Sequence, residues 1–228
     1  MRSTSVVVSA SALAFAFASA GSAHAALLGP TPYLSFADSP FSALALPTFH
    51  LENFEDGALN TPGVVASGGI VVAPGSFTDS VDADDGVIDG SGSAGSSFYS
   101  QNLLSSFRFT FDAGALGGLP THAGLVWTDV GITTSTTGVG DVTFEAFDAG
   151  GISLGLVGPI TLGDGTALSQ TAEDRFFGAT NPAGISAIEI RMGNSTDWEI
   201  DHLQYGLPTP GTAALLAAAG LAGLRRRR

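Results

Sequence analysis

Apolar and polar residues alternate without a break in two stretches of the chain. In residues 107–111 (FRFTF) and 188–192 (IEIRM), every second side chain is apolar. Because successive side chains of a β-strand point to opposite faces, this period of two predicts strands with one buried and one solvated face. Residues 125–127 and 142–147 also have strand-like compositions, and the glycine turn that follows predicts a hairpin over residues 149–154.

Short strands separated by turn residues continue through the region after Ala26. The chain has 31 glycines to form the turns, no segment sustains a helical period, and no fixed internal repeat is present. We therefore predict an all-β fold, an antiparallel β-sandwich of jelly-roll type. In the last segment, the apolar register slips between Ile200 and Leu203, which is the effect that a β-bulge produces.

The N-terminus has the three parts of a secretory signal peptide. Arg2 precedes an apolar run over residues 6–18, and small residues then lead to Ala23-His24-Ala25. The apolar run is shorter than the roughly 20 residues of a membrane-spanning helix, and Ala23 and Ala25 form an A-x-A cleavage site. We expect a signal helix over residues 1–25, removed by signal peptidase after Ala25.

The C-terminus also has three parts: the short motif Pro208-Thr209-Pro210, an apolar stretch over residues 212–224, and a cluster formed by Arg225, Arg226, Arg227 and Arg228. As a helix, the apolar stretch would be roughly 20 Å long, against about 30 Å for the hydrocarbon core of a membrane. The arginines would stay at the cytoplasmic face, which leaves the preceding domain outside. The predicted organisation is a signal peptide (1–25), an ectodomain (26–207) and a C-terminal sorting signal or membrane anchor (208–228).

This ending resembles the PEP-CTERM sorting signal of exported bacterial proteins, with Thr209 in the place of the family's usual Glu. The resemblance implies transient anchoring in the inner membrane, recognition by a membrane exosortase, cleavage near the motif, and transfer to the cell surface, outer membrane or extracellular matrix. A plain tail anchor is the alternative. The ectodomain is similar to uncharacterised exported PEP-CTERM proteins in residues 33–40, 172–178 and 198–206, a similarity that implies no activity.

The charge of the ectodomain excludes one class of partner. Residues 26–207 contain no lysine and only Arg108, Arg175 and Arg191, against all 21 acidic residues, for a formal charge near −18. Binding to nucleic-acid phosphates requires clustered Lys and Arg, so DNA and RNA are excluded as partners. The chain also lacks cysteine, so no disulfide stabilises it outside the cell. A bound cation, calcium above all, would relieve the acidic self-repulsion.

Two acidic segments are candidates for that cation. Residues 52–57 (ENFEDG) open the domain and residues 198–206 (WEIDHLQYG) close it, and together they resemble the first and last strands of jelly-roll carbohydrate-binding modules with a structural calcium. The resemblance implies Glu55 and Asp201 as ligands, with Asp56 or Glu52 as additions. The alternative is that these acids face solvent beside a buried Phe54 and Ile200.

A third acidic segment, residues 79–90, does not fit an EF-hand. Gly86 comes one residue too early, no Glu follows at the required position, and no helix flanks the loop. An irregular surface loop that attracts cations weakly, or a solvated turn, is the interpretation that remains.

Two enzyme motifs occur out of context. Residues 151–155 spell the G-x-S-x-G of a hydrolase around Ser153, but a strand and Pro159 follow instead of a helix. Residues 90–95 spell a dinucleotide fingerprint that opens no helix. The histidines lack the spacing of a zinc site. Four aromatic residues either form a sugar-stacking platform or fill the core: Tyr99, Trp127, Trp198 and Tyr205.

These patterns predict an exported, non-enzymatic protein at the cell surface or in the extracellular matrix, with a structural or adhesive role in exopolysaccharide. The alternative is a calcium-stabilised carbohydrate-binding module. A secreted hydrolase is a third possibility, based only on unpaired carboxylates and Ser153.

Overall fold

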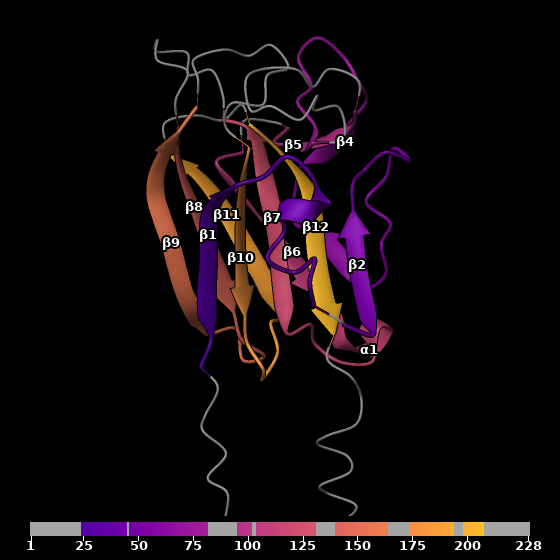
Figure 1. Ribbon diagram of the computed structural model, residues 1–228, viewed down its shortest axis with the longest axis vertical. Coiled ribbons are helices and arrows are strands. Elements are labelled where there is room, and N and C mark those ends of the chain that lie inside the picture. Colours follow the sequence, from indigo (N-terminus) through magenta and orange to yellow (C-terminus); the bar gives the residue numbers. More distant parts are fainter. Residues whose placement is uncertain are drawn as a thin grey trace, which may run out of the picture.

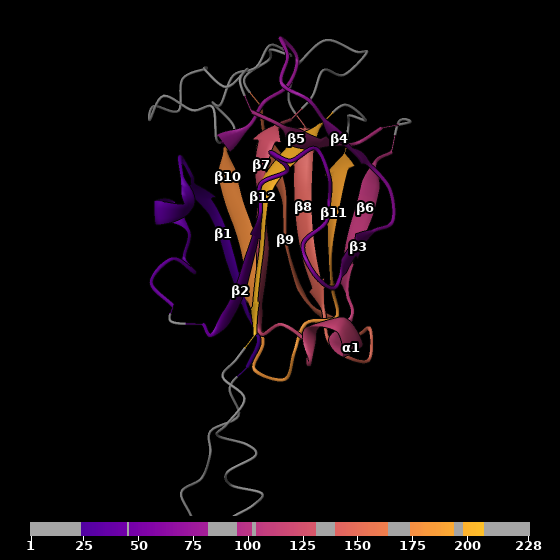
Figure 2. The ribbon, with the colours of Figure 1, turned by 90° about the vertical axis from the view of Figure 1, so that its right-hand side faces the viewer.

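The computed structural model describes residues 24–44, 46–81, 95–101, 104–130, 140–163, 174–193 and 198–207. These residues form two antiparallel β-sheets packed face to face, which Figure 2 shows edge-on. The predicted all-β sandwich is therefore confirmed. Residues 1–23 of the predicted signal helix and residues 208–228 of the predicted sorting signal or membrane anchor lie outside the described residues.

The larger sheet has seven strands within the described part of the chain. Its order is β1 (Ala26–Pro32), β10 (Arg175–Thr180), β7 (His122–Asp129), β12 (Glu199–Leu207), β5 (Ser97–Tyr99) and β4 (Ile70–Val72), and β2 (Thr48–Glu52) also pairs with β12 (Figure 1). The smaller sheet has five strands within the described part of the chain. Its order is β3 (Val64–Ala66), β6 (Ser106–Phe111), β11 (Ala187–Gly193), β8 (Gly140–Phe147) and β9 (Ser153–Leu162).

The two alternating segments of the sequence become neighbours in the smaller sheet. They form β6 and β11, which pair antiparallel with Ile188 opposite Phe109. Buried and partly exposed residues alternate along both strands, as the period of two predicted. The predicted hairpin is also present, because β8 and β9 pair and the Asp148 carboxylate accepts N–H bonds from Gly150 and Ile152 in the turn.

The core between the sheets is rich in aromatic side chains. The Trp198 ring stacks on Phe107 with centroids 4.5 Å apart, and Trp127 packs against Trp198 at 4.9 Å. All three side chains are buried. Aromatic pairs at such separations add to the stabilisation that their burial already provides.

A second, smaller cluster covers the opposite face of the larger sheet. The segment between β1 and β2 runs over that face (Figures 1 and 2), and its Tyr33 and Phe41 pack with Val81 on Val126 of β7 and Phe176 of β10. The larger sheet is therefore buried on both faces. This explains why the sequences of β7 and β12 do not alternate, since side chains on both faces are buried.

Among the described residues, two short helical turns interrupt the strands. One is a 3₁₀ turn, η1 (Phe36–Asp38). The other, α1 (Ala113–Leu116), is not predicted from the sequence, because four residues are too few to show a helical period. The Asp112 carboxylate caps α1 by accepting N–H bonds from Gly114 and Ala115, and Gly117 ends it with φ 75°.

The sandwich has two edges where the sheets meet. At one edge β1 and β9 are close, because a Cβ added at Gly155 would lie 2.9 Å from Leu27 Cδ1. At the other edge β3 and β4 end their sheets among the described strands, joined by Ser67, Gly68 and Gly69. We call the first the β1/β9 edge and the second the β3/β4 edge.

Candidate functional site

The predicted bulge in β12 is confirmed and determines where Asp201 lies. Pairing between β12 and β7 shifts register between Asp201 and Gln204, and His202 has φ 44°. The Asp201 side chain is fully buried, and its Oδ2 accepts hydrogen bonds from Ser80 Oγ and the Val81 N–H, both at 3.0 Å. Its Oδ1 accepts the His202 N–H at 2.6 Å. Asp201 thus binds residues 80 and 81 to the larger sheet.

Glu199, two residues earlier, fixes the same segment. Its Oε2 accepts the Asp79 N–H at 2.8 Å and the Ser97 hydroxyl at 2.7 Å. The Thr128 hydroxyl donates to the Asp79 carbonyl at 3.0 Å. Glu199 and Asp201 therefore fix the first three residues of the acidic segment 79–90, whose residues 82–90 lie outside the described part.

Glu55 reaches the same end of the sheet. Its Oε1 accepts the Ser96 N–H at 2.5 Å. A Cβ added at Gly95 would lie 2.2 Å from Ser80 Oγ and 3.1 Å from Glu55 Oε1. The side chains of Ser80 and Glu55 therefore both lie close to Gly95. Since Ser80 binds Asp201, the fold brings the two predicted ligands Glu55 and Asp201 to either side of one serine and one glycine.

The other two acids of the opening segment have local roles. Asp56 is exposed, and its carboxylate accepts the Ala58 N–H at 3.0 Å and the Asn60 side-chain amide at 2.5 Å. Glu52 is buried, and its two oxygens accept N–H bonds from Phe54, Asn60 and Thr61. Both side chains shape the loop over residues 53–61. Of the alternative, Phe54 and Ile200 are buried as stated, but Glu52 and Asp201 do not face solvent, because both are buried as well.

Within the described residues, no three His, Asp or Glu side chains form a group that could hold a metal ion. Calcium binding by Glu55, Asp201 and Asp56 stays a prediction. Sequence reasoning missed the buried acids at this end of the sheet: Asp79, Asp129, Asp174 and Glu199. Glu199 faces Asp129 in the β12–β7 pairing. No pattern in the sequence distinguishes these buried carboxylates from exposed ones, because the pairing that buries them joins distant segments.

A buried polar network connects the N-terminal segment to β12. Ser39 Oγ donates to Gln204 Oε1 at 2.6 Å, Gln204 Nε2 donates to Tyr33 Oη at 2.9 Å, and Tyr33 Oη lies 2.9 Å from His202 Nδ1. Because Tyr33 Oη accepts from Gln204, its own proton is available to His202 Nδ1, which favours the tautomer protonated at Nε2. Residues 33–40 and 198–206, singled out in the sequence, thus meet in the fold.

The aromatic residues do not form the sugar-stacking platform. Trp127, Trp198 and Tyr205 are fully buried, and only Tyr99 is partly exposed. The Trp198 indole donates to the Leu104 carbonyl at 3.0 Å, and the Tyr205 hydroxyl donates to the Pro62 carbonyl at 2.6 Å. Burial raises the pKa of Tyr205 above its ordinary value. These side chains fill the core, the alternative that the sequence left open.

The hydrolase motif lacks the geometry of a nucleophile elbow. Ser153 begins β9, which continues to Leu162, so a strand stands where the elbow requires a helix. The Ser153 hydroxyl accepts the Gly155 N–H at 3.2 Å within the strand. The dinucleotide-like residues 90–94 lie outside the described part of the chain.

Compared with known proteins, the chain matches no family model, and neither the curated proteins nor the solved structures yield a match. In the ranges that the structure describes, no helix has the length and apolar character needed to cross a membrane.

Proposed function

We propose that the chain is an exported, non-enzymatic structural or adhesive protein of the cell surface or extracellular matrix. In this proposal, signal peptidase removes residues 1–25, and the segment 208–228 anchors the protein transiently in the inner membrane. An exosortase-like enzyme then acts near Pro208-Thr209-Pro210, and Arg225–Arg228 stay at the cytoplasmic face. The ectodomain is retained at the outer membrane or in the matrix, within exopolysaccharide.

One observation carries the non-enzymatic part of the proposal. Among the described residues, acidic and aromatic side chains of the kind that could act in catalysis or ligand binding instead hold the fold together. Trp127 and Trp198 lie in the core, Glu52 and Glu199 bind loop N–H groups, and Tyr33 takes part in a buried network. A protein whose acids and aromatics serve its own stability fits a structural role outside the cell.

We also infer that the sandwich is of jelly-roll type. The supporting feature is the repeated passage of the chain from one sheet to the other: β6 and β11 belong to the smaller sheet, whereas β5, β7, β10 and β12 belong to the larger one. Jelly rolls distribute successive strands over two sheets in this way.

Mass spectrometry of the protein isolated from the cells that produce it tests the proposed sorting. The expected result is a chain that begins at Ala26 and has lost the residues beyond about Pro210, recovered from the surface or matrix fraction. An intact Arg228 on the mature form would indicate a tail anchor instead. Recovery of the uncleaved chain among cytosolic proteins would refute export.

The second candidate is a calcium-stabilised carbohydrate-binding module. It is favoured by the convergence of Glu55 and Asp201 on Ser80 and Gly95, next to the start of the acidic segment 79–90. Calcium takes six to eight oxygen ligands, so the acids of that segment would have to complete the site.

Thermal unfolding with and without a chelator tests this candidate. The chelator should lower the melting temperature of the wild-type protein, and Glu55→Gln or Asp201→Asn should reduce that difference. Asp148→Asn in the β8–β9 turn is the matched control, because the Asp148 carboxylate accepts the N–H groups of Gly150 and Ile152 and is not among the predicted ligands. A melting curve indifferent to chelation would exclude a structural calcium. A glycan array at controlled calcium would then test carbohydrate binding directly.

A further inference from the structure

Strand β1 begins and strand β12 ends at the same end of the sandwich. One row of paired residues crosses four neighbouring strands there: Ala26 of β1, Thr180 of β10, His122 of β7 and Gly206 of β12. Ala26 and Gly206 are therefore roughly 14 Å apart, three inter-strand spacings of about 4.8 Å. Figures 1 and 2 show the start of β1 and the end of β12 at this end, where α1 also lies. The chain thus enters and leaves the ectodomain at one end.

Three connections between strands form the surface of this end: residues 112–121, which contain α1, residues 148–152 in the β8–β9 turn, and residues 181–186. Main-chain hydrogen bonds join them. The Ile185 N–H donates to the Pro120 carbonyl at 2.7 Å, and the Ser186 N–H donates to the carbonyl of Phe147, next to the turn, at 2.9 Å. We call this continuous surface the α1 end.

The α1 end has little charge. Its three connections contain no lysine or arginine, and their acidic residues are Asp112 and Asp148. Both carboxylates accept main-chain N–H bonds, from Gly114 and Gly150 respectively. Apart from Asp112, the exposed residues of these described ranges are alanine, glycine, proline and one isoleucine, Ile152, whose side chain is 69% exposed. Such a surface can lie against lipid headgroups at little electrostatic cost.

Acidic side chains gather at the opposite end of the sandwich. Those already described there are Glu55, Asp79, Asp129, Asp174, Glu199 and Asp201. We call this the acidic end. Residues 26–207 have a formal charge near −18, so a surface with anionic headgroups repels the acidic end more strongly than the α1 end.

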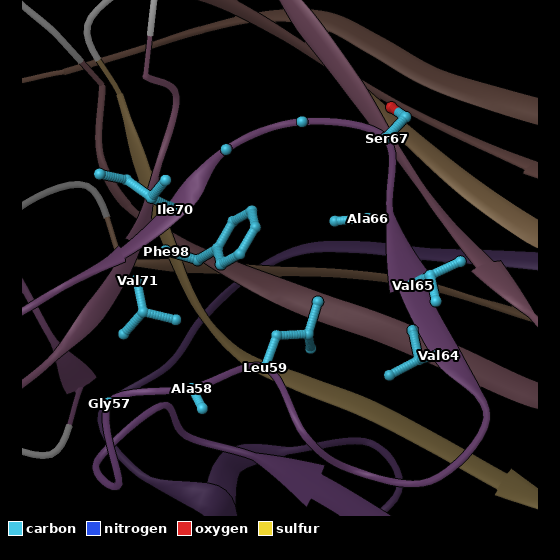
Figure 3. Close-up of a pocket in the computed structure, with 12 residues that line it drawn as sticks. Gly57, Ala58, Leu59, Val64, Val65, Ala66, Ser67, Ile70, Val71 and Phe98 are labelled. Atoms are coloured by element: carbon cyan, nitrogen blue, oxygen red, sulfur yellow. The ribbon is translucent and has the colours of Figure 1, made fainter.

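A second uncharged surface lies on the side of the sandwich. At the β3/β4 edge, an open pocket of about 560 Å³ lies between β3 and β4 (Figure 3). Its lining residues carry no charge, and the side chain of Val65 is 64% exposed. Exposed Glu55 and Asp56 directly precede Gly57 of the lining, however. Contact with lipid through this side would therefore bring two carboxylates to the headgroups.

The distance to the predicted membrane segment also favours the α1 end. The apolar stretch begins at Thr212, five residues after Leu207 at the end of β12. Because a chain spans at most about 3.6 Å per residue, the Cα atoms of Leu207 and Thr212 are at most about 18 Å apart. Strand β12 has nine residues and is about 30 Å long. An anchor over residues 212–224 therefore holds the α1 end near the membrane, whereas the acidic end is beyond its reach in an upright domain.

We propose that the α1 end lies against the lipid surface while residues 212–224 anchor the chain, and that the acidic end is directed away from the membrane. The inference rests on the proposed anchoring and adds the surface that the folded domain presents to the lipid. The short connection brings the α1 end within reach of the headgroups, and its low charge allows contact with them. The predicted ligands Glu55 and Asp201 then lie on the part of the domain that faces away from the membrane.

Fluorescent labels at two matched positions measure this orientation in the full chain, reconstituted into vesicles of phosphatidylcholine and phosphatidylglycerol. The chain contains no cysteine, so Ile152→Cys and Phe77→Cys each accept a single label. The two side chains are 69% and 70% exposed, and Phe77 lies two residues before Asp79 of the acidic end. Lipids with a nitroxide on the headgroup should quench the label at position 152 several-fold more than the label at position 77.

Sedimentation of the same vesicles distinguishes failure of the orientation from failure of the anchoring. The chain should sediment with the vesicles, and Leu216→Arg in the apolar stretch should reduce this several-fold. Sedimentation that is absent, or unchanged by Leu216→Arg, contradicts anchoring by residues 212–224 and the orientation with it. In an anchored chain, equal quenching at positions 152 and 77 overturns the orientation alone. Stronger quenching of a label on Val65→Cys than at position 152 also overturns it, because the domain would then lie on its side.

A second measurement tests the contribution of charge with a matched pair of substitutions. Ala183 of the α1 end and Ala73, which follows β4 at the acidic end, are both exposed. In vesicles with phosphatidylglycerol, Ala183→Asp should weaken quenching at position 152, because the new carboxylate faces anionic headgroups. In phosphatidylcholine alone it should not, and Ala73→Asp should leave quenching unchanged in both. Equal effects of the two variants would overturn the α1 end as the surface that faces the lipid.

Discussion

The acidic side chains of the two sheets have different kinds of partner. The smaller sheet has one wet face, on which Glu189 of β11 binds Arg108 at 2.6 Å and Arg191 at 2.7 Å, and Arg191 also binds Glu145 of β8 at 2.9 Å. The larger sheet is covered on both faces, and its buried Glu199 and Asp201 accept N–H and O–H bonds from distant segments. We call the first arrangement the ion-pair network.

Residues 26–207 contain three arginines, and the difference between the sheets shows how the fold uses them. Two of the three lie in the ion-pair network, and Arg108 also covers the Phe147 ring at 4.0 Å from its centroid. Glu199 and Asp201 of the larger sheet are held by backbone and hydroxyl donors, which replace the hydrogen bonds that each carboxylate loses when it leaves water. Those bonds also attach residues 79–81 to the sheet, and the hydrogen bonds of Gln204 to Ser39 and Tyr33 attach the segment 33–44, so the polar groups there order loops as well as strands.

Loss of the outer cluster on the larger sheet should have the largest effect on stability. The Phe176 ring lies 5.3 Å from Phe41 and packs over Gly124 and Gly178, where an added Cβ would approach it within 3 Å. Phe176→Ala would leave a cavity between the outer segment and the sheet, at a cost of about 3–5 kcal/mol. Equilibrium unfolding in denaturant measures this loss.

Leu156→Ala in β9 is the matched control on the smaller sheet. The Leu156 side chain is 44% exposed, so its truncation should change the unfolding free energy by less than about 0.5 kcal/mol. Equal losses for the two variants would mean that the outer cluster is not a real layer of the core and that the contrast between the sheets is wrong.

The same contrast explains what the sequence could predict of the fold. Strands β6 and β11 were predictable because one face of the smaller sheet is wet, which imposes alternation. The extent of β7 was not, because Tyr33, Phe41 and Val81, which lie 45 to 93 residues before Val126 in the chain, cover its outer face. A covering layer of that kind removes the polar positions on which alternation depends, and no local pattern reveals it.

The candidate site was predictable to a similar extent. The slip between Ile200 and Leu203 located the β12 bulge, and the similarity to jelly-roll modules paired Glu55 with Asp201. Asp56 is next to Glu55 in sequence but is directed away from it, because it accepts bonds in its own turn. The role of Glu199 could not be foreseen, since its partners Asp79 and Ser97 are more than 100 residues distant.

The buried network of the larger sheet gives the second largest effect. Tyr33→Phe removes a hydroxyl that lies between Gln204 Nε2 and His202 Nδ1, each 2.9 Å away. Leaving both buried groups without that partner should lower the unfolding free energy by about 1–3 kcal/mol. Ser42→Ala, in the same segment, is the control, because the Ser42 hydroxyl bonds only main-chain carbonyls near the surface and should cost less. A smaller loss for Tyr33→Phe than for Ser42→Ala would show that the network contributes little.

The ion-pair network of the smaller sheet should contribute less, and in a salt-dependent way. Its arginine side chains are 38% and 43% exposed, and partly exposed pairs contribute about 1 kcal/mol or less. Glu189→Gln should therefore cost about that amount in dilute buffer and almost nothing in 1 M salt, where the Debye length is about 3 Å. The cost of Tyr33→Phe should not change with salt, because neutral hydrogen bonds are not screened. A salt-independent cost for Glu189→Gln would mean that packing, and not charge, explains the role of that residue.

The smallest expected effect is on the pH dependence of the unfolding free energy, to which the two sheets contribute in different pH ranges. Burial lowers the pKa of His50 and His122, both in the larger sheet, below the ordinary value of 6.5. Below pH 6.5 the unfolded chain therefore binds protons that the folded chain does not, and stability falls as the pH decreases.

Burial alone would raise the pKa of Glu189, but hydrogen bonds from Arg108 and Arg191 and their charges outweigh it, so its pKa lies below the ordinary 4.5. Its contribution is complete above pH 4.5 and is lost below it. His122→Gln should reduce the slope of unfolding free energy between pH 7 and 5, whereas Glu189→Gln should alter the slope only below about pH 4.5. If His122→Gln leaves the first slope intact, burial does not disfavour the charged imidazole at that position, and the outer face of the larger sheet is wetter there than the fold indicates.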